Sequence, residues 1–108
     1  MFKDSESYPI IKNIILKSKP QKQFLKVREE SGVWLVTSNS MNLHFLNELA
    51  GKFLLLCSGD ITVSDAIDII LLEYDVCRDV LENDIMDLIS DLQHKRLIYI
   101  DPLEIDYE

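Results

Sequence analysis

Hydrophobic and polar positions divide the chain into a strand-like first half and a helical second half. Residues 24–29 and 33–37 are rich in β-branched and aromatic residues, and the turn-forming segment 30–32 separates them. After a second polar turn at 38–40, residues 42–46 form a third short run. The pattern predicts three strands paired in sequence order, which is a three-stranded antiparallel meander.

The first predicted helix, residues 48–57, is apolar almost all the way round. A helix of this kind must be covered by several neighbours at once, and Gly51 would let one of them come close. Asn47 is suited to cap the first turn, because its side chain can accept a hydrogen bond from a backbone N–H. Ser58 and Gly59 are expected to end the helix.

Two further helices are predicted. Thr62 and Asp65 resemble a capping box at the start of a helix that runs to about Tyr74. The longest helix runs from about Arg78 to Lys95 and is amphipathic. Its apolar stripe is expected to face the core and consists of Leu81, Ile85, Leu88, Ile89 and Leu92.

Residues 10–16 are apolar and β-branched and allow three interpretations. They could form an edge strand, a segment docked on the helices, or an element exchanged with a second copy of the chain. Pro9 is expected to stop regular structure before them. A docked segment would cover Ile69 and Leu72, two apolar residues outside the stripe of the second helix, and a partner is the alternative cover.

The chain has 108 residues, of which 47% are hydrophobic, and this suits one domain with a small core. We expect that domain to span residues 24–100, with residues 1–23 as an N-terminal extension and residues 101–108 as a loose acidic tail. Residues 97–100 predict a β-like segment that caps the core or pairs with the meander. The expected fold class is α+β, winged helix-turn-helix-like, with three strands followed by three helices.

Charge is distributed unevenly along the chain. Residues 1–30 hold seven Lys/Arg and four Asp/Glu, a balance of +3, whereas residues 31–108 hold four and fifteen, a balance of −11. Nucleic-acid binding rests largely on Lys and Arg that neutralise phosphates, so the acidic helical half argues against a nucleic-acid partner. The chain has no apolar run of about 18 residues and no signal-peptide pattern at its N-terminus, which predicts a cytoplasmic protein with no membrane partner.

Residues for catalysis or metal binding are scarce. Cys57 and Cys77 are expected to be reduced, and two cysteines and two histidines without close spacing make a poor metal site. The chain lacks a Gly-x-Ser-x-Gly motif, a phosphate-binding glycine-rich loop and a His-Glu-x-x-His motif. We therefore expect a binding protein without catalytic residues, metal or cofactor.

Several short segments form a pattern through their order and spacing. They are Phe45-Leu46-Asn47-Glu48-Leu49-Ala50, Leu56-Cys57-Ser58-Gly59-Asp60-Ile61-Thr62-Val63, Leu72-Glu73-Tyr74-Asp75-Val76, and Asp84-Ile85 with Leu88, Leu92, Leu97 and Ile98. Together they resemble the PqqD-like family, also called the RiPP recognition element, over about residues 24–100. His44 departs from the family pattern, in which an aliphatic residue is common, and Ser58 replaces the usual aspartate.

The resemblance implies a function. Members of this family bind the leader segment of a ribosomally synthesised, post-translationally modified precursor peptide and present it to a modifying enzyme, often a radical S-adenosylmethionine (radical SAM) enzyme. Because this chain has room for no further domain, it is expected to be a free-standing adaptor of this kind. An exposed strand edge also makes a homodimer a possible arrangement.

The predicted meander offers a place for such a peptide. Its third strand has one edge without a neighbour, where an extended peptide could add as a fourth strand between this strand and the third helix. Met86 is expected at the rim of the groove. The predicted contact residues are Asn42, Leu43, His44, Phe45 and Leu46 on the strand, and Leu81, Ile85, Met86 and Ile89 on the helix.

Alternation along the strand puts Asn42, His44 and Leu46 on one face and Leu43 and Phe45 on the other. The family pattern implies that His44 and Leu46 face the helices. His44 would then contact a leader carboxylate or carbonyl, or it is a partly buried histidine bonded to a neighbouring backbone group.

Two other functions compete with peptide binding. The strand and helix order permits a winged-helix DNA-binding regulator, although its recognition helix would be strongly acidic. The chain could also be a scaffolding subunit of an enzyme complex that reads no leader peptide.

Overall fold

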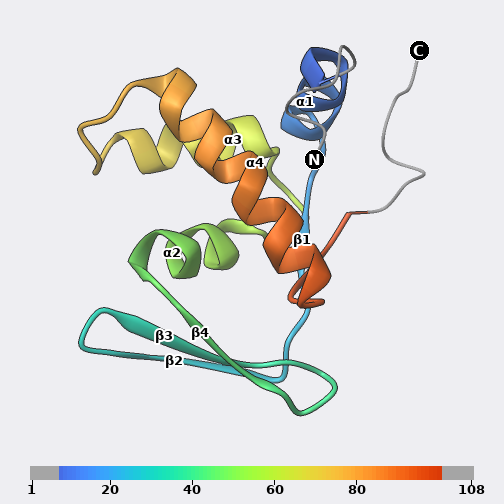
Figure 1. Cartoon of the computed structure of the whole chain (residues 1–108), viewed down its shortest axis with the longest axis vertical. Coiled ribbons are helices and arrows are strands. Elements are labelled where there is room, and N and C mark those ends of the chain that lie inside the picture. Colours follow the sequence, from blue (N-terminus) through green and yellow to red (C-terminus); the bar gives the residue numbers. More distant parts are fainter. Residues whose placement is uncertain (1–7, 101–108) are drawn as a thin grey trace.

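The computed structural model describes residues 8–100 of the chain. Four strands in succession are followed by three helices in an α+β arrangement, and Figure 1 shows the described helices above a small sheet. The elements in chain order are α1 (Tyr8–Leu16), β1 (Gln21–Lys22), β2 (Lys26–Glu30), β3 (Val33–Thr37), β4 (Leu43–Leu46), α2 (Glu48–Leu56), α3 (Val63–Leu71), α4 (Arg78–His94) and β5 (Ile98–Tyr99).

The meander is confirmed. The strands lie in the order β2-β3-β4, and both pairs are antiparallel. β2 and β3 are joined by Ser31 and Gly32, whose φ angles are 54° and 82°. A two-residue hairpin turn needs left-handed conformations of this kind, because they match the twist of the flanking strands.

The helix α2 begins at the predicted cap. The Asn47 side chain accepts a hydrogen bond of 2.9 Å from the Ala50 backbone N–H. The helix ends at Leu56, one residue before the predicted end, and Gly59 follows with a left-handed φ of 85°. Gly51 faces the indole ring of Trp34, so that α2 lies close to the inner face of the sheet.

The predicted capping box at the start of α3 is confirmed, because both of its hydrogen bonds are present. The Asp65 backbone N–H donates to Thr62 Oγ1 at 3.0 Å, and the Thr62 N–H donates to Asp65 Oδ2 at 3.1 Å. α3 ends at Leu71, short of Tyr74, and α4 spans nearly the predicted range. Four members of the predicted stripe of α4 are buried in the core and Leu88 is partly buried against it; the buried members are Leu81, Ile85, Ile89 and Leu92.

The N-terminal apolar segment is a helix and not an edge strand. Its isoleucines recur at 10, 11, 14 and 15, a spacing that puts them on one side of a helix, and packing on that side overrides the weak helix propensity of β-branched residues. The prediction that Pro9 stops regular structure is wrong. Pro9 is the second residue of α1, where it is accepted because the first helical turn tolerates proline.

The helix α1 packs on α3 and is joined to α4 by charge. Lys12 Nζ lies 3.0 Å from Glu82 Oε1, and Arg78 Nε lies 2.9 Å from the other oxygen of the same carboxylate. Arg78 also pairs with Asp68 on α3, so this ion cluster connects three helices. The expected cover of Leu72 by the N-terminal segment is wrong, because the Leu72 side chain is 85% exposed.

The C-terminal segment pairs outside the meander. β5 forms a two-stranded antiparallel sheet with β1, in which Gln21 lies opposite Tyr99. Leu97 and Ile98 are buried in the core, which confirms the capping interpretation. The expected acidic tail at 101–108 lies outside the described residues.

Among residues 8–100, no helix is long and apolar enough to cross a membrane.

Candidate functional site

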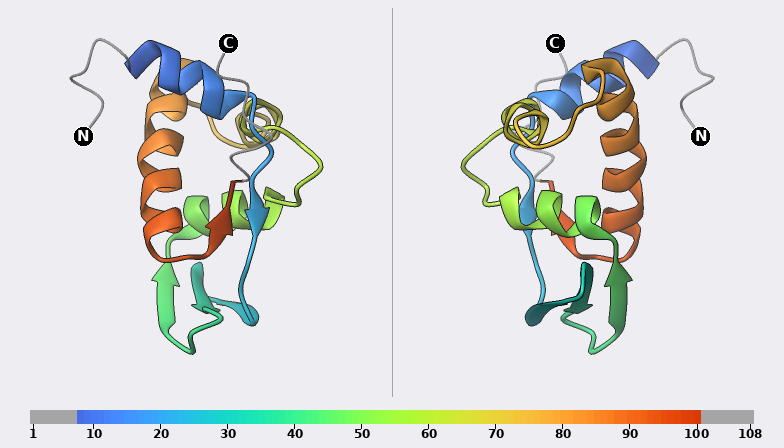
Figure 2. Two further views of the ribbon diagram at one scale, coloured as in Figure 1. Left: turned by 90° about the vertical axis from the view of Figure 1, so that its right-hand side faces the viewer. Right: turned by 90° about the vertical axis from the view of Figure 1, so that its left-hand side faces the viewer.

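The strand β4 is an edge of the sheet. It pairs with β3 on one side, and no described strand lies on its other side. The chain leaves β4 at Asn47, the cap of α2, and turns over the inner face of the sheet. In both views of Figure 2, β4 and α4 lie on the same side of the molecule, so that the free edge faces the side occupied by α4.

The hydrogen-bond phase of β4 identifies which backbone groups are free. Ser38 N–H donates to the Asn42 carbonyl at 2.8 Å, so this pair occupies a hydrogen-bonded position at the turn end of the β3–β4 ladder. Antiparallel ladders alternate, so His44 and Leu46 direct their backbone groups toward β3, and Leu43 and Phe45 direct theirs toward the open edge. Within residues 8–100, no further backbone hydrogen bond reaches the N–H or C=O of Leu43 and Phe45.

The side chains of β4 alternate as predicted. Leu46 is buried and His44 is partly buried on the inner face, whereas Leu43 is 55% and Phe45 is 66% exposed on the outer face. Asn42 belongs to the β3–β4 turn, where its N–H donates to Ser38 Oγ at 3.1 Å. The strand therefore offers two backbone donors and acceptors at its edge, with two large apolar side chains beside them.

His44 carries an unpaired ring nitrogen. Its Nε2 is buried and has no hydrogen-bond partner among the described residues, and the same holds for Nε1 of Trp34. The sheet register places His44 opposite Val36, diagonal to Trp34 on the inner face. Buried polar atoms without partners are rare and cost free energy, so a ligand group that hydrogen bonds to His44 Nε2 would be stabilised here.

The residues predicted on α4 lie deeper than expected. Met86, predicted at the rim of a groove, is 1% exposed and belongs to the core. The other three predicted residues, Leu81, Ile85 and Ile89, are at most 2% exposed. A contact between these four side chains and a peptide stays a prediction, because the structure brings none of them to the surface beside β4.

Two shifted pKa values have clear structural causes, and both lie outside β4. Burial raises the pKa of the Cys57 thiol to about 12, although Lys22 opposes this slightly. Burial alone would also raise the pKa of Glu82, but hydrogen bonds and charges from Lys12 and Arg78 together hold that pKa below its usual value. Both groups stabilise the fold: one is a core thiol and the other joins helices.

The surface of α4 is unsuited to phosphate. Asp84, Asp87 and Asp91 are exposed along it, and Lys95 pairs with Asp91 at 2.8 Å. A recognition helix in a DNA groove needs Lys or Arg beside the phosphates.

Among residues 8–100, no group of three His, Cys, Asp or Glu residues could hold a metal ion.

The comparisons with known proteins agree with this architecture. The family model described as Coenzyme PQQ synthesis protein D (PqqD) matches residues 33–98, which span β3 to β5 and include β4. A solved structure, "TbiB1 in Complex with the TbiA(beta) Leader Peptide", has the same fold with a TM-score of 0.62 and 19% sequence identity, covering 73% of this chain and 99% of that one. No curated protein matches the chain. Because the family model covers more than half of its 108 residues, the chain belongs to the PqqD family.

Proposed function

We propose that this chain is a non-catalytic adaptor of peptide natural-product biosynthesis. It captures the leader segment of a ribosomally synthesised, post-translationally modified precursor peptide and presents it to a modifying enzyme in the cytoplasm. The observation that carries the proposal is the free edge of β4, where the backbone groups of Leu43 and Phe45 point outward in a member of the PqqD family. The related fold of TbiB1, solved with a leader peptide, supports it.

The edge suits an extended peptide. A segment added beside β4 would exchange backbone hydrogen bonds with Leu43 and Phe45, and its side chains would alternate between the two faces of the sheet. One set would lie toward His44 and Leu46 and the other beside Leu43 and Phe45.

Backbone bonds alone would bind weakly. Four of them at about 0.5–1.5 kcal/mol each supply about 2–6 kcal/mol, whereas micromolar affinity needs about 8 kcal/mol. Burial of apolar leader side chains has to supply the rest, at about 25 cal/mol per Å². We therefore expect leader specificity to reside in apolar residues at alternating positions.

The chemistry of modification belongs to the partner enzyme. We propose a radical SAM enzyme as that partner, as the resemblance to the PqqD-like family implies, with the adaptor supplying position and proximity. Proximity alone can contribute strongly, because a tethered substrate meets the enzyme at a raised effective concentration.

Amide hydrogen exchange tests the proposal at the free edge. The probe is the synthetic leader of the precursor encoded beside the gene of this chain. Saturating leader should slow exchange of the Leu43 and Phe45 amides, while those of His44 and Leu46, already paired with β3, change little. Protection elsewhere with none at Leu43 and Phe45, or no binding at all, would contradict strand addition at β4.

A further inference from the structure

The outer face of the meander is unusually apolar. Alternation and register place eight side chains on this face, which we call the outer sheet face. Val33, Leu43 and Phe45 are 43%, 55% and 66% exposed there. The full set is Lys26, Arg28 and Glu30 on β2, Val33, Leu35 and Thr37 on β3, and Leu43 and Phe45 on β4.

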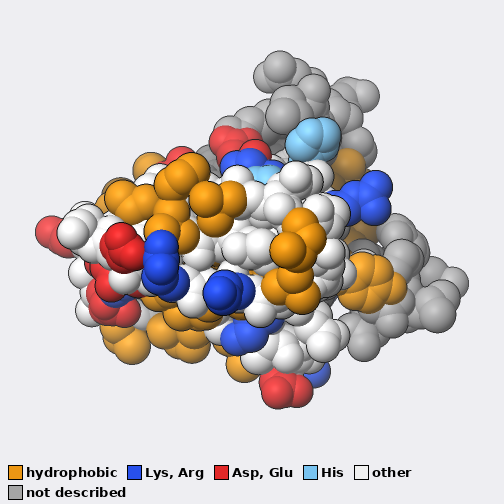
Figure 3. All heavy atoms as spheres, turned by 90° about the horizontal axis from the view of Figure 1, so that it is seen from below, with side chains coloured by type: hydrophobic (Ala, Val, Ile, Leu, Met, Phe, Trp, Pro, Cys, Tyr) orange, Lys and Arg blue, Asp and Glu red, His pale blue; other side chains and the backbone are white. Residues whose placement is uncertain are grey.

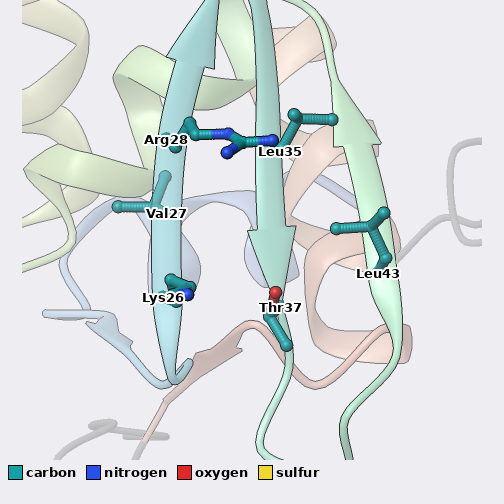
Figure 4. A pocket seen from close by; sticks show the side chains of 6 residues that line it. All are labelled: Lys26, Val27, Arg28, Leu35, Thr37 and Leu43. Carbon is teal, nitrogen blue, oxygen red and sulfur yellow. The ribbon is translucent and has the colours of Figure 1, made fainter.

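Hydrophobic and cationic side chains lie side by side on this face, with the cations on β2 and the apolar residues on β3 and β4. Figure 3 views the sheet from below and shows hydrophobic side chains with Lys and Arg beside them. In Figure 4, the Arg28 side chain reaches from β2 across β3 toward Leu35, with Leu43 on the far strand. A shallow hollow of 320 Å³ lies here, lined by Lys26, Val27, Arg28, Leu35, Thr37 and Leu43.

A solvent-facing sheet surface is ordinarily polar. Antiparallel sheets that cover a core on one side carry polar residues on the other. Here β3 and β4 place Val33, Leu35, Leu43 and Phe45 outward, and all the described helices lie on the opposite side of the sheet (Figure 1). Contiguous apolar surface with a polar border marks an interaction site.

The charges of the outer sheet face favour a partner protein that carries carboxylates. The chain has a net charge of −8, yet Lys26 and Arg28 make this face locally cationic, with Glu30 held 2.9 Å from Arg28. A symmetric pairing of two copies through this face would bring the cations of both copies onto one small interface. A different protein with carboxylates around an apolar ridge would meet complementary charge instead.

We propose that the outer sheet face docks the modifying enzyme, through an apolar ridge of that enzyme bordered by Asp and Glu. The inference rests on the proposed function. Leu43 and Phe45 join the two surfaces, since their backbone groups form the free edge and their side chains belong to the outer sheet face. An enzyme docked here would lie directly beside the strand-bound leader.

Charge reversal on β2 tests the docking surface, because β2 is separated from the peptide edge by β3. The variant is Lys26→Glu with Arg28→Glu. The control is Lys17→Glu with Lys19→Glu, two exposed lysines between α1 and β1 that change the net charge equally. The probes are the fluorescein-labelled leader, followed by anisotropy, and the purified modifying enzyme encoded beside the precursor, followed by biolayer interferometry with and without leader.

The β2 variant should bind the leader within about twofold of the natural chain and the enzyme at least about tenfold more weakly, while the control binds both normally. Equal enzyme affinity of variant and control would overturn the proposal. A parallel loss of leader binding would also overturn it, as would sedimentation showing a natural dimer that the variant dissociates. If the natural chain binds no leader, the proposed function fails, and enzyme binding by the peptide-free chain still decides the docking surface.

Discussion

The indole ring of Trp34 on β3 lies against the backbone of Gly51 on α2, where no side chain fits. A Cβ at position 51 would overlap three ring carbons of Trp34. This contact sets how closely α2 approaches the inner face of the sheet, and α2 is the element into which β4 leads.

Gly51→Ala should therefore destabilise the chain, in spite of the higher helix propensity of alanine. Overpacking of this kind costs about 1–3 kcal/mol, measurable by urea denaturation. A smaller side chain at position 34 should relieve the overlap, so Gly51→Ala should cost less in a Trp34→Leu background. Equal costs in the two backgrounds would show that the contact with Trp34 is not the cause.

The capping box of α3 gives a second stability prediction. Thr62→Ala removes the side-chain acceptor of the Asp65 N–H and should cost about 0.5–2 kcal/mol. Thr62→Ser keeps the hydroxyl and should cost much less in the same denaturation experiment. A serine variant as unstable as the alanine variant would assign the effect to the lost methyl group and not to the cap.

The ion cluster that docks α1 predicts a dependence of stability on pH. Lys12 and Arg78 lower the pKa of Glu82 in the folded chain below its usual 4.5, despite the opposing effect of burial. A depressed carboxyl pKa stabilises the fold above the unfolded pKa, and this contribution disappears as the pH falls through the folded value. The stability difference between the natural chain and Glu82→Gln should thus be largest near neutral pH and shrink below pH 4.5. A difference that stays constant from neutral to acid pH would contradict the ionic role of Glu82.

The two thiols should differ in reactivity. Cys77 is exposed, whereas Cys57 is buried with a pKa raised to about 12, and the thiolate is the reactive form. Ellman's reagent should therefore label one thiol of the native chain rapidly and the second only in denaturant. Cys77→Ser should abolish the rapid reaction, and rapid labelling of both thiols in the folded chain would contradict the burial of Cys57.

The helices and strands between residues 24 and 95 could be predicted because neighbouring residues in the sequence determine where they begin and end. Asn47, Thr62 and Asp65 cap helices through hydrogen bonds within one turn. Alternation placed His44 and Leu46 on one face of the strand, and the resemblance to the family implied that this face is the inner one. The α1 segment does not follow from local signals, since its isoleucines favour a strand by propensity and become helical through packing on α3.

Several features of the candidate site could not be predicted from residue patterns. Amphipathic spacing cannot separate a core residue from one that lines a groove, so Met86 was expected at a rim and is buried. The hydrogen-bond phase of β4, which leaves Leu43 and Phe45 free, follows from the pairing of Ser38 with Asn42 across the turn. Turn geometry sets that phase, and the residue pattern alone did not specify it. The outer sheet face likewise became evident only when the register aligned Arg28, Leu35 and Phe45 across three strands.

The central claim is that a leader peptide bonds to the outward backbone groups of β4. Phe45→Pro removes an outward donor and places a ring where the peptide would approach, yet it breaks no bond to β3, so an edge strand should tolerate it. Phe45→Ala keeps the donor and is the matched control, and His44→Pro, which breaks the ladder to β3, should unfold the sheet.

The deciding measurement is the affinity of the labelled leader for the two Phe45 variants, each shown to be folded by its urea transition. Strand addition predicts that Phe45→Pro binds the leader at least about tenfold more weakly than Phe45→Ala, since a lost hydrogen bond costs about 0.5–1.5 kcal/mol and the ring adds a steric clash. Equal affinities of the two folded variants would contradict binding at the free edge of β4.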